Sequence, residues 1–328
     1  MKNDQTGLLT RIRAFSTLAK PTSFSWWLFS FYIFLDRHIM NKNATTSSAP
    51  WLNQFARNEY SQAGEDGIIE KALEVINEND RWCVEFGAWD GVYLSNTRNL
   101  IANRGYSAVL IEGDMERCND LKKNFRDNKD IHPIHAFVGF ENNNGLDSIL
   151  EKTDIPLNFD VLSIDIDGND YHVWAAVKHY NPKLVVIEYN PTIPNAVEFI
   201  QPADMSITQG NSLLALTNLA KQKGYELIAV TQCNAIFVDS RYFELFGIAD
   251  NSIDAIRTDY SAVTYLFNGY DGTVFTSGCG RVCWHSIPYR HSRMQLVPLW
   301  LRTYPGNYGL TKKVFAKIYR YLIGANRT

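Results

Sequence analysis

The middle of the chain alternates between short apolar runs and amphipathic segments. Apolar residues recur at helical spacing in 64–76 and 211–224, which predicts two helices that each bury one face. Runs rich in Val, Ile and Leu stand between such segments and predict strands that are buried on both faces. The predicted strands are 82–88, 107–114, 131–139, 159–168, 183–190, 225–232 and 234–243, and further helices are predicted at 95–105, 115–128 and 170–180.

This alternation predicts an α/β domain with a doubly wound, mostly parallel sheet. The last two strands are separated by so few residues that we expect them to pair antiparallel. Ser95 is the residue expected to cap the helix that follows the first strand.

The regions outside this alternation have other patterns. Residues 41–50 are polar, rich in Ser and Thr, and are interpreted as a linker. The aromatic run 24–35 is shorter than the roughly 20 apolar residues that span a bilayer. We interpret it as a helix packed on the domain or on a second subunit, with an interfacial membrane segment as the alternative. Residues 310–327 predict a basic amphipathic helix, for which an acidic membrane surface and ordinary packing both stay open.

Composition narrows the classes of function. Hydrophobic residues make up 45% and charged residues 20%, as in a globular protein with a core. The net charge of −3 gives no reason to expect nucleic acid as a partner, because phosphate binding needs a concentrated basic surface. Five scattered cysteines argue against a disulfide framework and indicate a reducing compartment. Zinc at Cys279, Cys283 and His285 is a less favoured interpretation, because the CxxxC spacing is unusual and no second pair exists.

Acidic and amide residues stand where four of the predicted strands end. In open α/β sheets, ligands bind at the carboxyl ends of the strands, where the strand order reverses. Gly87 and Gly91 allow tight turns that bring the backbone close to a ligand. The strand-end residues are Glu85 and Asp90 after the first strand, Glu112 and Asp114 after the second, Asp165 and Asp167 after the fourth, and Glu188 and Asn190 after the fifth.

The residue types favour S-adenosyl-L-methionine (SAM) over a dinucleotide. A dinucleotide site would show GxGxxG, whereas this chain has GxxxG flanked by Glu85 and Asp90, which would repel a pyrophosphate. SAM has no phosphate, and its sulfonium and ammonium groups attract carboxylates. Glu112 lies 27 residues after Glu85, where an acid would accept the two ribose hydroxyls.

Five ordered motifs resemble the FkbM-type methyltransferases, a family within the class I SAM-dependent fold. The motifs are YSQAGEDGII (60–69), VEFGAWDGVYLSNT (84–97), LIEGD (110–114), LSIDIDGNDYHVW (162–174) and KLVVIEYNP (183–191). The resemblance covers roughly residues 60–240. It implies methyl transfer from SAM to a hydroxyl, often of a sugar in a glycan, polysaccharide or glycosylated natural product.

The resemblance also implies roles for individual residues. Glu85, Gly87 and Asp90 would line the methionine and adenosine side, and Glu112 would hold the ribose. The leading motif, with Ser61, Gln62 and Glu65, would fold over the cofactor. The predicted cofactor-binding set is Gln62, Glu65, Glu85, Gly87, Ala88, Asp90, Asn96, Glu112 and Asp165. Many members have Glu where Asp167 stands, so the acceptor side of this chain departs from the family pattern.

A sugar hydroxyl is a weak nucleophile and needs a base or a metal to lower its pKa. Asp165, Glu188 and Asn190 offer oxygen ligands at two strand ends, a set that suits Mg²⁺. Helix capping and strand-end hydrogen bonding are the alternative explanation for these residues.

Catalysis without a metal would need a side chain as the base. The predicted catalytic residues are Asp165, Asp167 and His172. His285, in the region that the resemblance does not cover, is a further candidate that a lid would supply.

These inferences predict an aromatic, helical extension with a linker at 1–50, a SAM-dependent methyltransferase domain at 51–245, and a C-terminal extension at 246–328 with an acceptor-site lid. The expected partner is a saccharide or glycan acceptor, in the cytoplasm and without nucleic acid. Methylation of a lipid or small natural product, and a non-catalytic SAM-fold scaffold at a membrane glycan-assembly complex, are the alternatives. Peripheral contact with the inner face of a membrane and homo-oligomerisation are left open.

Overall fold

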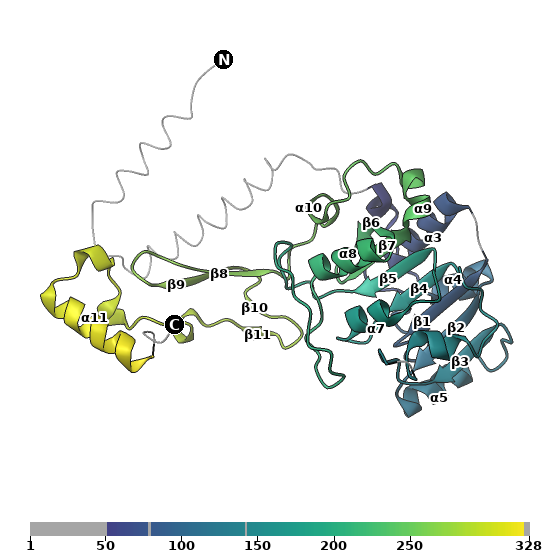
Figure 1. The fold of residues 1–328 in the computed structure, drawn as a ribbon, viewed down its shortest axis with the longest axis horizontal. Helices are drawn as coiled ribbons and strands as arrows, with labels where there is room; N and C mark the ends of the chain where they lie inside the picture. Colours follow the sequence, from purple (N-terminus) through teal and green to yellow (C-terminus); the bar gives the residue numbers. More distant parts are fainter. Residues whose placement is uncertain (1–50, 78–79, 142, 325–328) are drawn as a thin grey trace, which may run out of the picture. The chain divides into compact units, whose positions relative to one another are not determined.

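The computed structural model describes residues 51–77, 80–141 and 143–324 (Figure 1). The aromatic run 24–35, the linker 41–50 and the last residues of the predicted basic helix lie outside the described residues. The described residues belong to one compact unit. Among the residues that the structure describes, no helix is both long and apolar enough to cross a membrane.

A seven-stranded sheet forms the centre, with the strand order β3-β2-β1-β4-β5-β7-β6 (Figure 1). Its strands are β1 (Trp82–Phe86), β2 (Ser107–Glu112), β3 (Ile131–His135), β4 (Val161–Ile164), β5 (Leu184–Glu188), β6 (Tyr225–Val230) and β7 (Asn234–Asp239). The first five pair in parallel, whereas β7 runs antiparallel to both β5 and β6. The predicted doubly wound, mostly parallel sheet and its antiparallel last pair are confirmed.

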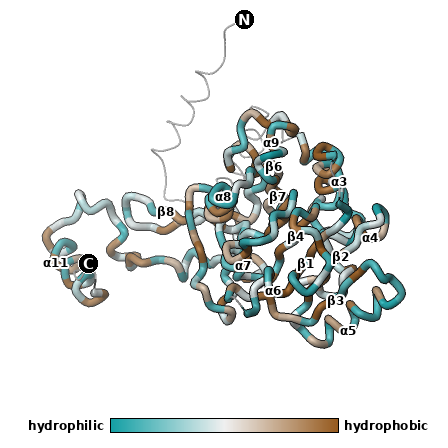
Figure 2. The backbone as a smooth tube through the Cα atoms, turned by 45° about the vertical axis from the view of Figure 1, so that its right-hand side comes forward, coloured by the Kyte–Doolittle hydropathy of each residue, from teal (hydrophilic) through white to brown (hydrophobic). Residues whose placement is uncertain are grey.

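Helices cover both faces of this sheet. Alternate strand residues point to opposite faces, so Val84 and Phe86 enter one core whereas Cys83 enters the other. The first core is shared with α6 (Leu146–Leu150), α7 (Asp170–Ala176) and α8 (Leu213–Gln222), and the second with η1 (Trp51–Phe55), α3 (Glu65–Ile76), α4 (Arg98–Arg104) and α5 (Met115–Asn124). Figure 2 shows the apolar strands between the more polar helices.

The strand order reverses between β1 and β4. From β1 the chain continues through β2 to β3 on one side, and it then returns to place β4 and β5 on the other side of β1. The register pairs Phe86 with Ile164, and Ile164 with Ile187. The residues that follow these strands therefore meet at one edge of the sheet, which is where the rule for open α/β sheets places a ligand.

Two small hairpins and a terminal helix follow the sheet. The hairpins are β8 (Thr264–Asn268) with β9 (Val274–Gly278), and β10 (Arg281–Val282) with β11 (Ile287–Pro288). The remaining elements are α9 (Ser240–Phe243), η2 (Glu244–Phe246), α10 (Ile253–Ile256), η3 (His291–Arg293), η4 (Leu299–Leu301), η5 (Pro305–Asn307) and α11 (Leu310–Leu322). The turn between β10 and β11 holds Trp284 and Ser286 in the left-handed region, at φ 59° and 54°.

Candidate functional site

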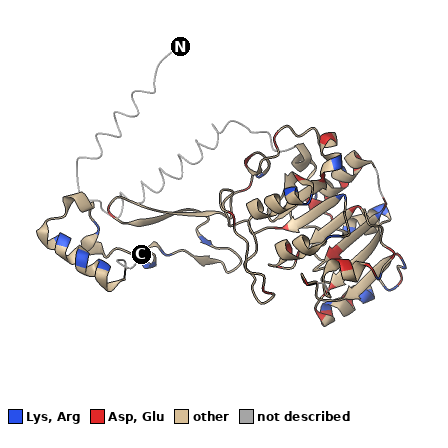
Figure 3. Cartoon of the chain, in the orientation of Figure 1, with Lys and Arg blue, Asp and Glu red and all other residues tan. Residues whose placement is uncertain are grey.

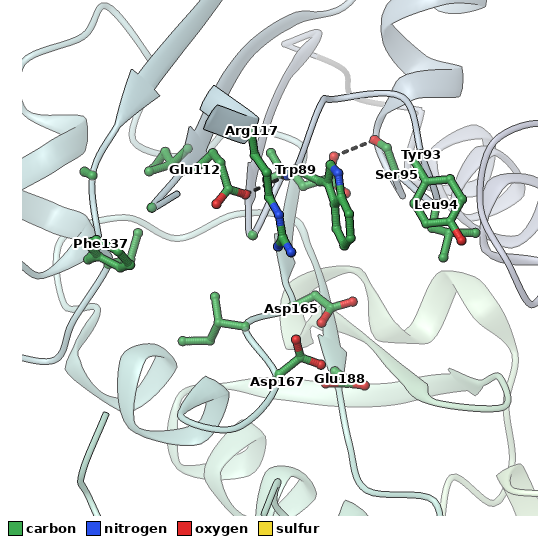
Figure 4. A pocket seen from close by; sticks show the side chains of 18 of the residues that line it. Trp89, Tyr93, Leu94, Ser95, Glu112, Arg117, Phe137, Asp165, Asp167 and Glu188 are labelled. Carbon is green, nitrogen blue, oxygen red and sulfur yellow. Dashed lines mark hydrogen bonds between the residues drawn. The ribbon is translucent and has the colours of Figure 1, made fainter. Parts of the chain in front are cut away.

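A cavity of about 580 Å³ opens at the carboxyl ends of β1, β2, β4 and β5 (Figure 4). Each of these strands, or the loop after it, contributes lining residues, among them Gly87, Glu112, Asp165 and Glu188. The hairpin β10–β11 adds Trp284 from outside the sheet. The volume is typical of a site for a small molecule or cofactor.

Gly87 brings the loops after β1 and β4 into direct contact. Its φ of 75° lies in the left-handed region, and a Cβ atom at this position would lie 1.7 Å from the backbone oxygen of Asp165. A residue with a side chain therefore cannot occupy position 87 unless the two loops move apart.

Glu112 ends β2 with both carboxylate oxygens oriented by backbone groups. Oε2 accepts from the amide of Trp89 at 2.8 Å, and Oε1 accepts from the amide of Asp114 at 2.7 Å. Each oxygen can accept a further hydrogen bond from a ligand in the cavity. The carboxylate thus keeps acceptor capacity toward the cavity, and its contact with a ribose stays a prediction.

Glu85 is buried and holds the loop that precedes α4. Its carboxylate accepts from the hydroxyl of Ser95 at 2.5 Å, the amide of Asn96 at 2.8 Å and the hydroxyl of Thr97 at 2.7 Å. Burial raises the pKa of Glu85, and these hydrogen bonds oppose that rise. Because the loop is fixed in this way, α4 begins at Arg98, three residues after the predicted cap Ser95.

Two predicted cofactor-binding residues, Glu65 and Asn96, make hydrogen bonds within the fold. Glu65 is fully buried and accepts from the hydroxyl of Thr231 at 2.6 Å and the amide of Asn234 at 3.1 Å, so it joins α3 to the β6–β7 turn. Asn96 donates its side-chain amide to the hydroxyl of Ser163 at 3.1 Å. Neither residue lines the cavity.

Asp90 also lies outside the lining. Its Oδ1 atom accepts from the amides of Val92 and Tyr93 at 2.9 and 2.8 Å, which makes it the organiser of the turn after β1. The structure does place the other members of the predicted cofactor set in the cavity wall, which are Gln62, Glu85, Gly87, Ala88, Glu112 and Asp165.

Three carboxylates gather at the ends of β4 and β5. One oxygen from each of Asp165, Asp167 and Glu188 lies within 4.8 Å of the others, and no other group of three potential metal ligands occurs among the described residues. Burial, followed by the charges of neighbouring acids, raises the pKa of both Asp165 and Glu188. Asp165 and Glu188 are therefore easier to protonate than isolated carboxyl groups, and a nearby cation would oppose this rise of the pKa. Figure 4 shows these carboxylates together, apart from Glu112.

Asp170 shapes the loop that presents two of these acids. It is buried, and its carboxylate accepts from the amides of Ile166 and Gly168, both at 2.9 Å. Burial raises the pKa of Asp170 to about 6 in spite of these hydrogen bonds. The tight loop holds Asp167 at a φ of 57°, in the left-handed region.

The predicted metal ligand Asn190 is not a member of the acidic group. Its Oδ1 atom accepts from the amide and the hydroxyl of Thr192 at 2.9 and 2.7 Å, and its amide donates to the carbonyl of Gln209 at 2.8 Å. The chain leaves β5 after Glu188, so Asn190 turns into the following loop, and Asp167 stands in its place.

The predicted base His172 lies outside the cavity. Its Nε2 atom donates to the carbonyl of Gln201 at 2.8 Å, and its ring packs beside Phe140 with the centroids 5.6 Å apart. In this position the imidazole links α7 to the loop that contains Gln201. Of the predicted catalytic residues, Asp165 and Asp167 line the cavity.

Sequence reasoning missed Trp284. Its side chain is 70% exposed and lines both the main cavity and a neighbouring cavity of about 370 Å³ that also contains His285. Zinc at Cys279, Cys283 and His285 was the less favoured interpretation of the motif around it. The two sulfurs lie 3.9 Å apart, but among the described residues these three do not form a group of potential metal ligands. Nothing in the local sequence indicates that this tryptophan reaches the strand ends.

Arg117 and Phe137 are further lining residues that were not predicted. The guanidinium of Arg117 lies 3.7 Å from the ring centroid of Trp89, and both side chains border the cavity near Glu112 (Figure 4). The only available signal for Arg117 was its place in the first turn of α5, which Asp114 caps.

Comparisons with known proteins find only distant structural similarity to solved methyltransferase structures. No family model matches the sequence, and no curated protein matches it. Similar solved structures include the N-terminal domain of EvdMO1 with SAH bound, at 10% identity over 53% of this chain and 80% of that chain, with a TM-score of 0.35. A SAM dependent methyltransferase from Aquifex aeolicus matches at 10% identity, 57% and 95% coverage and a TM-score of 0.34.

The glycopeptide N-methyltransferase MtfA complexed with sinefungin matches at 13% identity, covering 55% of this chain and 87% of that chain, with a TM-score of 0.33. At such identities and TM-scores, the likeness assigns neither a reaction nor a substrate to this chain.

Proposed function

We propose that this protein is a SAM-dependent methyltransferase whose cofactor occupies the cavity beside Gly87 and Glu112. The observation that carries the proposal is the carboxylate of Glu112, held by two backbone amides at the end of β2 with free acceptor capacity toward the cavity. Such a carboxylate suits the ribose hydroxyls. The acids on the far side, Asp165 and Glu188, favour a sulfonium and an ammonium and disfavour a phosphate.

We further propose a saccharide hydroxyl as the acceptor. The neighbouring cavity of about 370 Å³ joins polar groups of Asn190, Thr208 and Gln209 with the ring of Trp284. An aromatic surface beside amides and hydroxyls suits a ligand with many hydroxyl groups. A lipid or small natural product as acceptor is the alternative, which a preference for apolar substrates would favour.

In the proposed reaction, the acceptor oxygen attacks the methyl carbon as the carbon–sulfur bond breaks, and S-adenosylhomocysteine (SAH) leaves. The fold mainly positions the two reactants. The hydroxyl proton passes to the carboxylate group of Asp165, Asp167 and Glu188, which all line the cavity and of which Asp167 is the most exposed residue. Burial and repulsion raise the pKa of Asp165 and Glu188, so each of these carboxylates, when deprotonated, is a stronger base than an isolated carboxylate.

The same three carboxylates fit a magnesium ion. They supply oxygen ligands only, and a cation would relieve the repulsion that raises the pKa of Asp165 and Glu188. The proposed set is Asp165, Asp167 and Glu188, without Asn190. A bound Mg²⁺ would lower the pKa of an acceptor hydroxyl.

Calorimetric titration with SAH tests the cofactor. We expect micromolar affinity for the wild-type chain, and a loss of roughly tenfold to a hundredfold for Glu112→Gln, because a charge-assisted acceptor is removed and the new amide faces a backbone amide. The matched control is Glu116→Gln, an exposed glutamate of α5 outside the cavity, which should bind as the wild type does. Repeating the titration and a turnover assay with Mg²⁺ and with EDTA tests the metal.

An absence of SAH binding by the wild-type chain would overturn the proposal and favour a scaffold that keeps the fold without the activity. Equal affinities for wild type and Glu112→Gln would show that the ribose lies elsewhere.

Replacing Trp284 with alanine is expected to raise the acceptor KM roughly tenfold and to leave SAH affinity unchanged, because the acceptor loses an aromatic contact. The assay would use the best substrate from a panel of methyl glycosides. Trp300→Ala removes a tryptophan that does not line the cavity and serves as the control. A selective effect of Trp284→Ala on SAH affinity would instead assign this residue to the cofactor.

A further inference from the structure

Charge is divided between two parts of the chain. Residues 272–324 contain eight Lys and Arg and no Asp or Glu, whereas residues 49–271 contain 17 Lys and Arg against 33 Asp and Glu. The small net charge of −3 therefore conceals a strongly acidic domain followed by a basic segment. Figure 3 shows the basic residues on α11.

The helix α11 turns its apolar face to solvent. Its attachment to the rest of the segment uses the opposite side, where Ala316 is buried and the hydroxyl of Tyr319 donates to the carbonyl of Leu296 at 2.7 Å. The exposed stripe, with side chains between 48% and 84% exposed, consists of Leu310, Val314, Phe315, Ile318, Tyr321 and Leu322. These apolar side chains thus add nothing to the core of the domain.

Basic and aromatic residues border this stripe. Lys313, Lys317 and Arg320 are exposed and follow one another at spacings of four and three along one edge of α11. Trp300 packs against Phe315 with the ring centroids 5.9 Å apart and is itself half-exposed. An apolar stripe with a Lys/Arg edge and a neighbouring tryptophan is the pattern of a helix that lies in a membrane interface.

We propose that the α11 surface, defined as the exposed stripe with Lys313, Lys317, Arg320 and Trp300, binds a bilayer that contains anionic lipids. A bilayer can bind both the apolar stripe and the basic edge, because the stripe would insert at the acyl boundary and the basic side chains would contact the anionic headgroups. The same surface of a second copy would bring like charges together. A nucleic acid would leave the apolar stripe exposed to water.

The charge of the acidic domain determines which part of the protein faces the bilayer. Residues 49–271 are repelled by anionic headgroups, so the α11 surface is the part of the described chain that approaches the bilayer. Each Lys or Arg near such a surface strengthens binding, and salt weakens it. This proposal does not depend on methyl transfer.

Vesicle flotation of the full-length protein tests it. We expect flotation with vesicles of phosphatidylcholine and phosphatidylglycerol in a two to one ratio, little with phosphatidylcholine alone, and release at about 0.5 M NaCl. The triple variant Lys313→Gln, Lys317→Gln, Arg320→Gln should lose roughly a hundredfold in partition coefficient. The pair Ile318→Ser, Leu322→Ser should also lose binding, because it removes the apolar component.

The matched control removes three exposed lysines from the acidic domain, as Lys122→Gln, Lys123→Gln, Lys129→Gln, and should float like the wild type. Thermal melting and SAH titration verify that every variant is folded. Failure of the wild type to float would overturn the proposal. So would a triple variant that floats normally, since binding would then lie elsewhere, for example in residues 24–35.

Light scattering tests whether the α11 surface instead binds a second copy of the chain. A wild-type dimer that the Ile318→Ser, Leu322→Ser variant dissociates, in the absence of vesicle binding, would assign the α11 surface to a second copy of the chain and overturn the membrane proposal.

Discussion

Asparagine in place of Asp165 is expected to slow methyl transfer by two to four orders of magnitude, the range associated with a lost acid–base group. Asn keeps the size of the side chain but cannot accept the hydroxyl proton, and it also removes a charged ligand from the proposed metal set. Single-turnover transfer from SAM would measure the rate, and SAH titration would show whether the cavity is intact. Asp120→Asn, an exposed substitution on α5, is the control.

The acidic pair Asp165 and Glu188 is also expected to make the free energy of unfolding depend on pH. Burial and repulsion raise the pKa of Asp165 and Glu188, so in the cofactor-free folded chain this pair keeps protons that the unfolded chain loses above about pH 4. A folded state that binds more protons loses stability as the pH rises, by about 1.4 kcal/mol per pH unit for each extra proton. The wild-type free energy of unfolding should therefore fall from about pH 5 through neutrality.

Asp165→Asn should flatten this decline, because Glu188 then has one acidic neighbour fewer. Asp170 and Glu85, whose pKa values burial also raises, contribute to both curves, so the difference between wild type and variant reports the pair. Urea unfolding at several pH values measures it. Parallel curves for the two proteins, together with unchanged turnover, would remove Asp165 from the site.

Gly87→Ala is expected to destabilise the protein by several kcal/mol and to abolish SAH binding. The added Cβ atom would lie 1.7 Å from the backbone oxygen of Asp165, so the loops after β1 and β4 must separate. The left-handed backbone at φ 75° adds a cost of about 1 to 2 kcal/mol for any residue with a side chain. Urea unfolding and SAH titration would measure the two effects.

Gly105→Ala separates these two causes. Gly105 has a φ of 67°, but a Cβ atom there would meet no atom within 4 Å. The variant is therefore destabilised only by the left-handed backbone conformation and not by a steric clash. We expect it to lose about 1 to 2 kcal/mol of stability and to bind SAH normally. Equal stability losses for the two glycine variants would mean that the loops at 87 and 165 do not pack as the structure has them.

The sheet could be predicted from the sequence because its central strands are buried on both faces and form continuous apolar runs. Their ends were predicted too long: the run 159–168 contains a strand only at Val161–Ile164, because the polar residues after it form the loop that Asp170 caps. The helix Leu146–Leu150 was missed, since five residues are too few to show helical periodicity.

The site was predictable to the extent that it follows from strand order. Glu112 and Glu188 end β2 and β5, and Asp165 directly follows β4; because these strands are parallel members of one sheet, topology alone brings the three residues to one edge. Glu65 and Asp90 were expected at the cavity but do not line it, because a sequence does not distinguish a carboxylate that accepts hydrogen bonds within the fold from one that faces a cavity.

Trp284 enters the cavity from a two-stranded sheet that is separate from the seven-stranded one. The half of the cavity proposed for the cofactor lies at the strand ends of the core sheet, where most substitutions cost stability, whereas its outer wall includes a short hairpin whose strands are exposed. Mutations in that hairpin can accumulate without unfolding the domain. Under the proposed function, the choice of acceptor can therefore diverge during evolution while the binding of the methyl donor stays fixed.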